Sequence, residues 1–396
     1  MNCQSCASPT TLVLSLGSLI PCNSYISEPE PQTAYPTDLY FCETCGLAQL
    51  GHVPPQTVTF PASYPYTSST TRILRENFAQ LYEETQRFNP LGPNDLVIDI
   101  GGNDGNLLSN WVGKCQVFNV TPEDVGKLGE ARGIRWAKNY WTKDFAARMM
   151  RQCQQANLIT ATNVFAHVPD PHDFLDGVDE ALAPGGMFVS ESHYLPGLLR
   201  GVQYDTLYAE HARYLSLQSI RHQLAAHDFT VIGARHIPTH GGSIRVYATR
   251  KGEERDCPLD PARRIYEDGV TLYDFEEFRG KVVKHRRDLL RLVGEIRGLG
   301  MRIVGIGAPS RASTLVSYCG LGADDLECVY EVAGSHKVGK WMPGTRIPIV
   351  PESSIPPSAE FALLLSHHVG FELKKAWRER GYQGRFIEPL PTVRID

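Results

Sequence analysis

A chain of 396 residues is too long for one hydrophobic core, and 42% hydrophobic with 21% charged residues is the composition of an ordinary soluble globular protein. A net charge of -5 at pH 7 gives no broad basic surface for nucleic acid, and no apolar run is long enough to span a membrane. The first residues, M-N-C-Q-S-C, have neither the basic nor the apolar region of a signal peptide. We therefore expect a cytoplasmic protein of two or three domains, whose ten cysteines are thiols or metal ligands and not disulfides.

Two C-x-x-C pairs near the N-terminus, Cys3 with Cys6 and Cys42 with Cys45, predict a metal site. Two such pairs separated by a few tens of residues can place four thiolates tetrahedrally, which suits Zn²⁺. A redox pair is disfavoured because no thioredoxin-like βαβ pattern surrounds either motif. Four protein ligands leave no open position, so this zinc is expected to be structural. Cys22 lies between the pairs and is either a substitute ligand or a packed thiol.

The remaining elements predict two α/β units after a zinc-binding module at residues 1–60. Alternating strands and helices between residues 61 and 255 are typical of a doubly wound, Rossmann-like parallel sheet. The expected strands are residues 96–100, 116–120, 157–162 and 187–190, with antiparallel closing strands at 230–235 and 243–249. The expected helices begin at Ile73, Gly105 and Glu123 and cover residues 173–182.

The C-terminal unit, residues 256–396, is expected to begin with a long helix or helix pair at 261–297. A second, smaller Rossmann-like α/β unit follows, with strands near residues 302–306, 328–331 and 361–365 and a helix from Phe371. Its loop, Gly305-Ile-Gly307, opens a helix and suits phosphate through backbone N–H groups, with Arg311 as a charged clamp. A bare βα turn is the alternative, and we favour a diphosphate site.

A glycine-rich loop after the first central strand predicts a cofactor site. Residues 96–108 read L-V-I-D-I-G-G-N-D-G-N-L-L, an apolar strand that ends in Asp99 and a turn. Gly101, Gly102 and Gly105 allow the backbone to turn tightly and to approach a ligand. In an open α/β sheet a nucleotide-like cofactor binds at this position. The spacing matches neither a dinucleotide fingerprint nor a phosphate loop, and on this loop alone an ordinary turn is the alternative.

This D-x-G-x-N-D-G loop resembles the first motif of class I S-adenosylmethionine (SAM) methyltransferases. The order of the regions resembles one family, the SAM-dependent sugar C-methyltransferases, of the tetronitrose, mycarose and noviose type, over nearly the whole chain. Besides the C-x-x-C pairs, the motifs that carry the resemblance are Y-P-Y-T-S-S (64–69), I-G-G-N-D-G (100–105), T-N-V-F-A-H (162–167), Y-D-T-L-Y-A-E-H (204–211), H-G-G-S (240–243) and G-I-G-A-P-S-R (305–311). The resemblance implies three parts: a zinc module, a SAM-binding methyltransferase domain and a C-terminal domain that binds a nucleotide sugar.

The resemblance also implies the chemistry, C-methylation beside the ketone of a nucleotide-linked 4-keto-deoxysugar, with thymidine diphosphate as the expected nucleotide. His211 is the implied general base, since a neutral imidazole can accept the α-proton near pH 7. Glu210 would position the sugar, and Tyr66, His167 and Tyr208 would donate to the keto oxygen and sugar groups. The SAM contacts are expected from Asp99, Gly101, Asn103, Asp104, Gly105, Thr121 and Asn163. The substrate contacts are expected from His240, Gly241, Ser310, Arg311, Tyr330, Glu331 and Lys337.

The chain departs from the family pattern at three places. Thr121 stands where the family has the Glu that binds the SAM ribose, so that Glu123 or Asp124 reaches in or the ribose is held more weakly. Gly102 stands where relatives commonly carry Cys, and residues 367–369, H-H-V, replace a Trp-Asn-type segment. Three other functions stay open: SAM-dependent O- or N-methylation, a zinc-containing binding module with a degenerate cofactor fold and, least favoured, a reductase. The expected partners are the nucleotide sugar but no nucleic acid or membrane, and the chain has no coiled-coil pattern, which favours a monomer.

Overall fold

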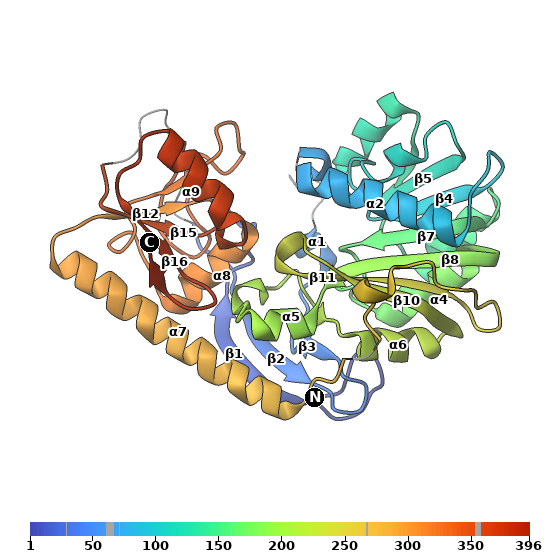
Figure 1. The fold of residues 1–396 in the computed structure, drawn as a ribbon, viewed down its shortest axis with the longest axis horizontal. Coiled ribbons are helices and arrows are strands. Elements are labelled where there is room, and N and C mark those ends of the chain that lie inside the picture. The colour runs from blue at the N-terminus through green and yellow to red at the C-terminus, as the bar shows by residue number, and fades with distance from the viewer. Residues whose placement is uncertain (29, 61–66, 71, 267, 353–357) are drawn as a thin grey trace.

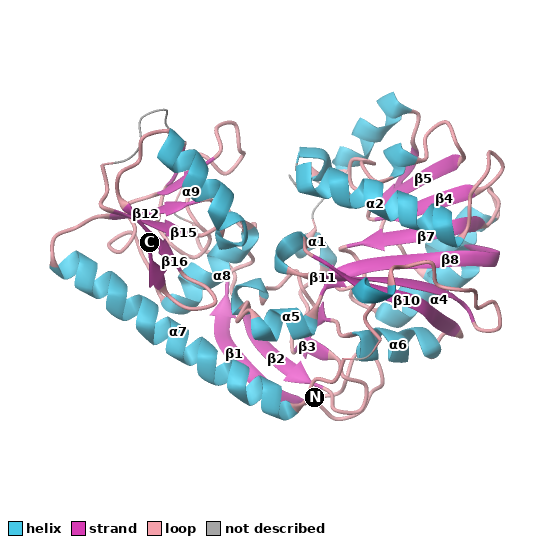
Figure 2. Cartoon of the chain, viewed as in Figure 1, coloured by secondary structure: helices cyan, strands magenta, loops and turns pink. Residues whose placement is uncertain are grey.

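The protein is described by a computed structural model that covers residues 1–28, 30–60, 67–70, 72–266, 268–352 and 358–396. Its strands form three sheets, with the first lying between the other two (Figures 1 and 2). Within these residues, no helix is both long and apolar enough to cross a membrane. The α/β architecture expected from the sequence is therefore present, with a small N-terminal sheet and two larger α/β units.

The central sheet has seven strands in the order β10-β11-β8-β7-β4-β5-β6. Its strands are β4 (Leu96–Ile100), β5 (Gln116–Thr121), β6 (Arg135–Lys138), β7 (Ala156–Thr162), β8 (Leu182–His193), β10 (Phe229–Ile237) and β11 (Ser243–Arg250). All pairings are parallel except those of β10 and β11, which close one edge antiparallel as expected. Helices pack on both faces because alternate side chains of β4 point to opposite sides: Ile98 belongs to one apolar cluster and Val97 to another.

Of the described α-helices around this sheet, the sequence predicted the first and the third and missed the other three. In chain order, these helices are α2 (Arg72–Phe88), α3 (Lys143–Met150), α4 (Pro171–Ala181), α5 (Leu195–Arg200) and α6 (Leu217–Ala225). The helices predicted from Gly105 and Glu123 are wrong: turns lead to a short 3₁₀ segment, η2 (Leu108–Asn110), in one place, and η3 (Asp124–Arg132) is 3₁₀ in the other. In η3, Gly126 lies against the Trp136 ring, where a Cβ would come within 2.3 Å, and glycine weakens an α-helix.

The C-terminal sheet has six strands in the order β14-β13-β12-β15-β16-β17. They are β12 (Ile303–Ile306), β13 (Val329–Glu331), β14 (Ile349–Pro351), β15 (Phe361–Leu364), β16 (Arg385–Glu388) and β17 (Arg394–Ile395). Its helices are α8 (Ser310–Cys319) and α9 (Gly370–Glu379). The expected bridging helix is a single one, α7 (Leu272–Gly298), and it runs from the C-terminal unit to the first sheet (Figure 1).

The first sheet joins distant parts of the chain. It has the order β1-β2-β3-β9, with β1 (Thr11–Leu19), β2 (Tyr35–Phe41), β3 (Ala48–Leu50) and β9 (Arg213–Tyr214), and a short helix, α1 (Gln56–Thr59), follows it. The strand β9 comes from beyond residue 200 and pairs with β3 through Ala48 and Tyr214. One apolar cluster runs from β1 and β2 through α7 into the C-terminal sheet. The domain boundaries at residues 60 and 255 stay a prediction.

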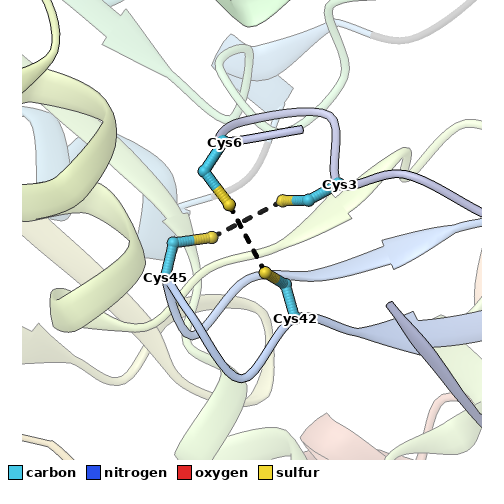
Figure 3. A group of neighbouring side chains, drawn as sticks. All are labelled: Cys3, Cys6, Cys42 and Cys45. Atoms are coloured by element: carbon cyan, nitrogen blue, oxygen red, sulfur yellow. Dashed lines mark hydrogen bonds between the residues drawn. The ribbon is translucent and has the colours of Figure 1, made fainter. Parts of the chain in front are cut away.

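Four cysteines at the tip of the first sheet form a metal site (Figure 3). The Sγ atoms of Cys3 and Cys45 are 3.5 Å apart, as are those of Cys6 and Cys42, and all four lie within 4.8 Å of one another. A tetrahedral zinc with Zn–S bonds of about 2.3 Å needs sulfurs about 3.8 Å apart, so the cluster fits Zn²⁺. Cys22 is not part of it: its thiol donates to Glu210 at 3.0 Å.

A buried charge network fastens α2 to the central sheet. The Arg245 guanidinium on β11 lies 2.6 Å from a Glu84 oxygen on α2 and 2.5 Å from a Glu191 oxygen on β8. Arg235 and Tyr247 also bind Glu84. The arrangement holds because each buried carboxylate has a cation beside it.

Arg245→Leu should lower the free energy of unfolding by about 3–5 kcal/mol, since it leaves two buried carboxylates with too few cations. Arg72→Gln is the matched control on α2, because its pair with Glu76 is exposed and worth less than about 1 kcal/mol. Denaturant unfolding of the full chain measures both. Equal effects of the two variants would contradict the account.

Cys42→Ala should abolish zinc binding and lower the melting temperature, whereas Cys22→Ala should retain one zinc per chain. The physical reason is that three remaining thiolates leave the site incomplete, while the Cys22 thiol is directed to Glu210. Metal content of the purified protein is the measurement. Loss of zinc from the Cys22 variant, or much less than one zinc per chain in the unmutated protein, would refute the assignment.

Candidate functional site

A cavity of about 530 Å³ lies at the carboxyl ends of β4, β5 and β7. This is the edge of a doubly wound sheet where ligands bind. Its wall combines the glycine loop, helix α2, the segment of residues 206–211 and the start of α8. Among the residues expected to act, the lining includes Asp99, Gly101, Asn103, Asn163, His167, Tyr208, Glu210, His211, Ser310, Arg311 and Lys337.

Two residues of the cavity lining at the glycine loop, Asp99 and Asn163, each have a buried oxygen with no hydrogen bond to the described residues. The Asp99 carboxylate accepts from Thr160 Oγ1 at 2.7 Å through one oxygen, while Oδ2 is buried with no hydrogen bond to the described residues. Burial raises the pKa of Asp99 to about 7. Asn163 Oδ1 is likewise buried with no hydrogen bond to the described residues. Gly101 has φ +67°, and a Cβ there would lie 2.3 Å from Val164, so the turn requires glycine.

Ser68, near the end of the Y-P-Y-T-S-S motif, holds the glycine loop in place. Ser68 donates its N–H to Asn103 Oδ1 at 3.0 Å and its hydroxyl to Asp104 Oδ1 at 2.6 Å. Asp104 and Gly105 therefore shape the loop and are not among the residues that line the cavity. Tyr66, in the same motif, lies outside the described residues.

At the end of β5, the two acids that could replace the family Glu lie on different sides. Thr121 is fully buried and donates its hydroxyl to the Glu123 carboxylate. Glu123 lines the cavity, and burial raises its pKa above the ordinary value. Asp124 instead pairs with Lys138 at 2.5 Å on the exposed side. Of the two candidates, only Glu123 faces the cavity.

Aromatic rings surround His211, which is 4% exposed. Ring centroids of Tyr208, His193 and His167 lie 4.0, 4.4 and 4.7 Å from it. His211 Nδ1 lies 2.8 Å from the Thr206 carbonyl oxygen. Because a carbonyl can only accept, Nδ1 carries the proton, and Nε2 is the basic nitrogen of the neutral ring. Sequence reasoning missed His193, although a polar residue at the end of a parallel strand is a signal that could have found it.

Glu210 is anchored by the N-terminal region. Its Oε1 accepts from Cys22 Sγ at 3.0 Å and from Asn23 Nδ2 at 3.5 Å. The carboxylate is 4% exposed, and Oε2 has no hydrogen bond to any residue the structure describes. Burial raises the pKa of Glu210. No sequence signal links Cys22 to Glu210, 188 positions away.

Of the residues expected to hold the nucleotide, the structure brings some to the cavity and not others. Tyr330 and Glu331 are not among the lining residues: the Tyr330 ring packs against Trp377, and Glu331 accepts from the Ala308 N–H at 2.6 Å. Lys337 lines the cavity and donates to the Ala308 carbonyl at 2.7 Å.

Gly241 is not among the residues that line the cavity, and the side chain of its neighbour His240 is not described. A Cβ on Gly241 would lie 2.6 Å from Gln203 and 3.4 Å from Arg311, so the backbone packs closely against these side chains, and the expected substrate contact of Gly241 stays a prediction. Arg311 itself forms an ion pair with Asp205 at 3.0 Å. The guanidinium is therefore already neutralised by the protein.

Comparisons with known proteins cover the chain in three segments. Family models match a zinc binding domain at residues 3–60, a methyltransferase domain at 73–234 and a C-methyltransferase C-terminal domain at 238–391. C-methyltransferase NovU of Streptomyces niveus is 29% identical over an alignment of 408 positions, which covers 100% of this chain and 96% of that protein.

Solved structures resemble only part of the chain. A SAM-dependent methyltransferase from Clostridium acetobutylicum is 14% identical and covers 45% of this chain and 92% of its own, with a TM-score of 0.36. The N-methyltransferase NodS from Bradyrhizobium japonicum, bound to S-adenosylhomocysteine, is 15% identical and covers 48% and 92%, with a TM-score of 0.36. Such partial superpositions support no conclusion about the site.

The three family models and the full-length relative agree with the geometry of the cavity and of the cysteine cluster. SAM is the cofactor of the central domain, and the four cysteines are its neighbouring domain's zinc ligands. The chain is a SAM-dependent methyltransferase in which a zinc binding domain precedes, and a segment similar to the C-methyltransferase C-terminal domain follows, the methyltransferase domain.

Proposed function

We propose that the enzyme methylates the carbon next to the ketone of a nucleotide-linked 4-keto-deoxysugar, with thymidine diphosphate as the nucleotide. The observation that carries the proposal is that His211 and Glu210 lie in the same cavity as the glycine loop and the start of α8. One cavity can thus hold the cofactor, the reacting carbon and the nucleotide side by side. The expected monomeric state and cytoplasmic location stay predictions.

The cofactor end of the cavity suits SAM. The unpartnered oxygens of Asp99 and Asn163 are acceptors for the ammonium group of its amino-acid tail, and Glu123 is an acceptor for the ribose hydroxyls. Bound SAM supplies an electrophilic methyl group. The intact glycine loop and the inward position of Glu123 weigh against a binding module with a degenerate cofactor fold. The loop at residues 305–311 lacks the third glycine of a dinucleotide site, which weighs against a reductase.

At the reacting carbon, His211 is the proposed base. Its Nδ1–H is held by the Thr206 carbonyl, which leaves the lone pair of Nε2 to take the α-proton. Donors must then stabilise the negative charge that moves to the keto oxygen, and Tyr208 is in position beside His211. Tyr66, the other expected donor, lies outside the described residues.

His167 can donate to the oxygen only in its protonated form. Its Nδ1 lies 2.6 Å from the Glu210 carbonyl, so that nitrogen carries a proton, and Nε2 of the neutral ring is an acceptor. A protonated His167 would stabilise the enolate electrostatically. Glu210 Oε2, buried and unbonded within the described chain, is the acceptor we assign to a sugar hydroxyl or amine.

His211→Asn should reduce both methylation and exchange of the α-hydrogen with D₂O by about 10²–10⁴-fold, the usual contribution of a general base. A thymidine-diphosphate-linked 4-keto-deoxysugar is the probe, and mass spectrometry follows both reactions. Binding of S-adenosylhomocysteine by calorimetry should be unchanged, which controls for folding. Product that retains its α-hydrogen would show O- or N-methylation instead, and a variant within a few-fold of normal would exclude His211 as the base.

Glu123→Gln should weaken S-adenosylhomocysteine binding by about 10-fold or more, because it removes the charge of one hydrogen-bond acceptor worth about 1.5–3 kcal/mol. Asp124→Asn is the matched control, since its side chain pairs with Lys138 away from the cavity. Calorimetry measures both affinities. If the Asp124 variant lost as much affinity as the Glu123 variant, the ribose assignment would have to be abandoned.

A further inference from the structure

The turn that precedes the His211 segment is held by the C-terminal domain. This 3₁₀ turn, η4 (Tyr204–Thr206), belongs to the methyltransferase domain by sequence, and its three residues are at most 2% exposed. The Tyr204 hydroxyl lies 3.1 Å from His285 Nδ1 on α7, and its ring packs against Tyr318 on α8. The turn thus lies inside the packing of the other domain.

Asp205 is the main link across the two domains. Its Oδ2 lies 3.0 Å from Arg311 Nε on α8 and 2.7 Å from His367 Nε2 on η7 (His367–Val369). Although burial acts to raise the pKa of Asp205, the charges of Arg311 and His367 lower it below the ordinary value. Gln203 adds a further hydrogen bond to Arg311 at 3.0 Å. The carboxylate is therefore ionised and bound on the C-terminal side.

The next residue carries this constraint into the site. The Thr206 carbonyl oxygen accepts from His211 Nδ1 at 2.8 Å and from the Tyr214 hydroxyl at 3.2 Å. That oxygen belongs to the planar peptide unit between Thr206 and Leu207, and the Leu207 N–H of this unit donates to the Tyr204 carbonyl at 2.9 Å. Anchoring the turn through the Asp205 side chain therefore restricts where the oxygen can lie. The oxygen in turn determines which His211 nitrogen carries the proton.

We propose that Arg311 and His367 are positioning residues: by holding Asp205 they fix the Thr206 carbonyl, and with it the tautomer and orientation of His211. This differs from the diphosphate clamp that the G-I-G-A-P-S-R motif suggested for Arg311. A guanidinium that left Asp205 to bind phosphate would leave a buried carboxylate without its cation, which is unfavourable. The kinetic consequences rest on the proposed function, whereas the effect on the His211 ring does not.

The first test measures the His211 ring directly in the full-length protein. Long-range ¹H–¹⁵N spectra of protein labelled with ¹⁵N-histidine report which ring nitrogen carries the proton, and His211→Asn identifies the signal. We expect a single Nδ1–H tautomer in the unmutated protein and a mixture, or a shifted signal, in Arg311→Gln and Asp205→Asn. Unchanged His211 signals in both folded variants would overturn the proposal, whether or not the enzyme proves active on the sugar.

The second test separates a positioning residue from a substrate ligand, using the thymidine-diphosphate-linked 4-keto-deoxysugar. Misplacement of a base by about 1 Å can cost about 100-fold, so kcat should fall about 10- to 100-fold in both variants with KM within about 3-fold. The double variant should be no worse than either single one, because the two residues act through one contact. A KM raised more than tenfold by Arg311→Gln, with kcat unchanged and no loss in Asp205→Asn, would instead make Arg311 a phosphate ligand.

The control is Arg297→Gln. Arg297 also pairs with an aspartate of the C-terminal domain, Asp325, at 2.7 Å, but the Arg297 side chain is 45% exposed and the pair is outside the cavity lining. Neither the His211 signal nor kcat should change in this variant. A change as large as that in Arg311→Gln would show a general loss of domain stability and would overturn the specific role.

Discussion

The segment of residues 203–214 carries Glu210 and His211, yet it has little secondary structure of its own: one 3₁₀ turn at its start and a two-residue strand at its end. A segment without its own ladder of backbone hydrogen bonds takes its position from whatever it contacts. Here the contacts come from both neighbouring domains. On one side β9 pairs with β3 and Cys22 binds Glu210, and on the other Asp205 binds Arg311.

This dependence gives the zinc domain a part in shaping the active site without contact between metal and substrate. Cys42 and Cys45 flank a turn that leads into β3, and β3 pairs with β9. Arg213 of β9 is fully buried and donates to the backbone carbonyls of Val168 and Pro169, beyond His167. The first sheet thus connects the cysteine cluster with the strand that follows His211 and, through Arg213, with the residues that follow His167.

The cofactor end of the cavity shows how a changed residue is accommodated locally. Thr121 cannot supply a carboxylate, but its hydroxyl binds the carboxylate of Glu123, two positions on, and that carboxylate faces the cavity. With the ribose role proposed for Glu123, the acid lies two positions further along the sequence than in the family pattern. Its raised pKa follows from burial, as does that of Asp99 on the neighbouring strand.

The sequence by itself determined the features that depend on short-range patterns. Six strands of the central sheet, the four zinc ligands and the glycine loop follow from spacing within a few residues and lie where they were expected, whereas β6 was missed. The two helices predicted from Gly105 and Glu123 are wrong. Gly105 packs tightly against Ile134 and Gly126 against Trp136, and helical spacing in the sequence does not reveal these tertiary contacts.

Only the tertiary structure decided which partners the candidate residues have. Residues Cys22 and Glu210 are 188 positions apart, and Asp205 and Arg311 are 106 apart, so no local pattern connects them. The role of Arg311 depends on this: its sequence context indicates a phosphate clamp, whereas a buried aspartate takes up its charge. Loop closure brings such distant groups together only when the whole fold forms, and this is why the sequence identified the chemistry of the site but not the contacts that orient it.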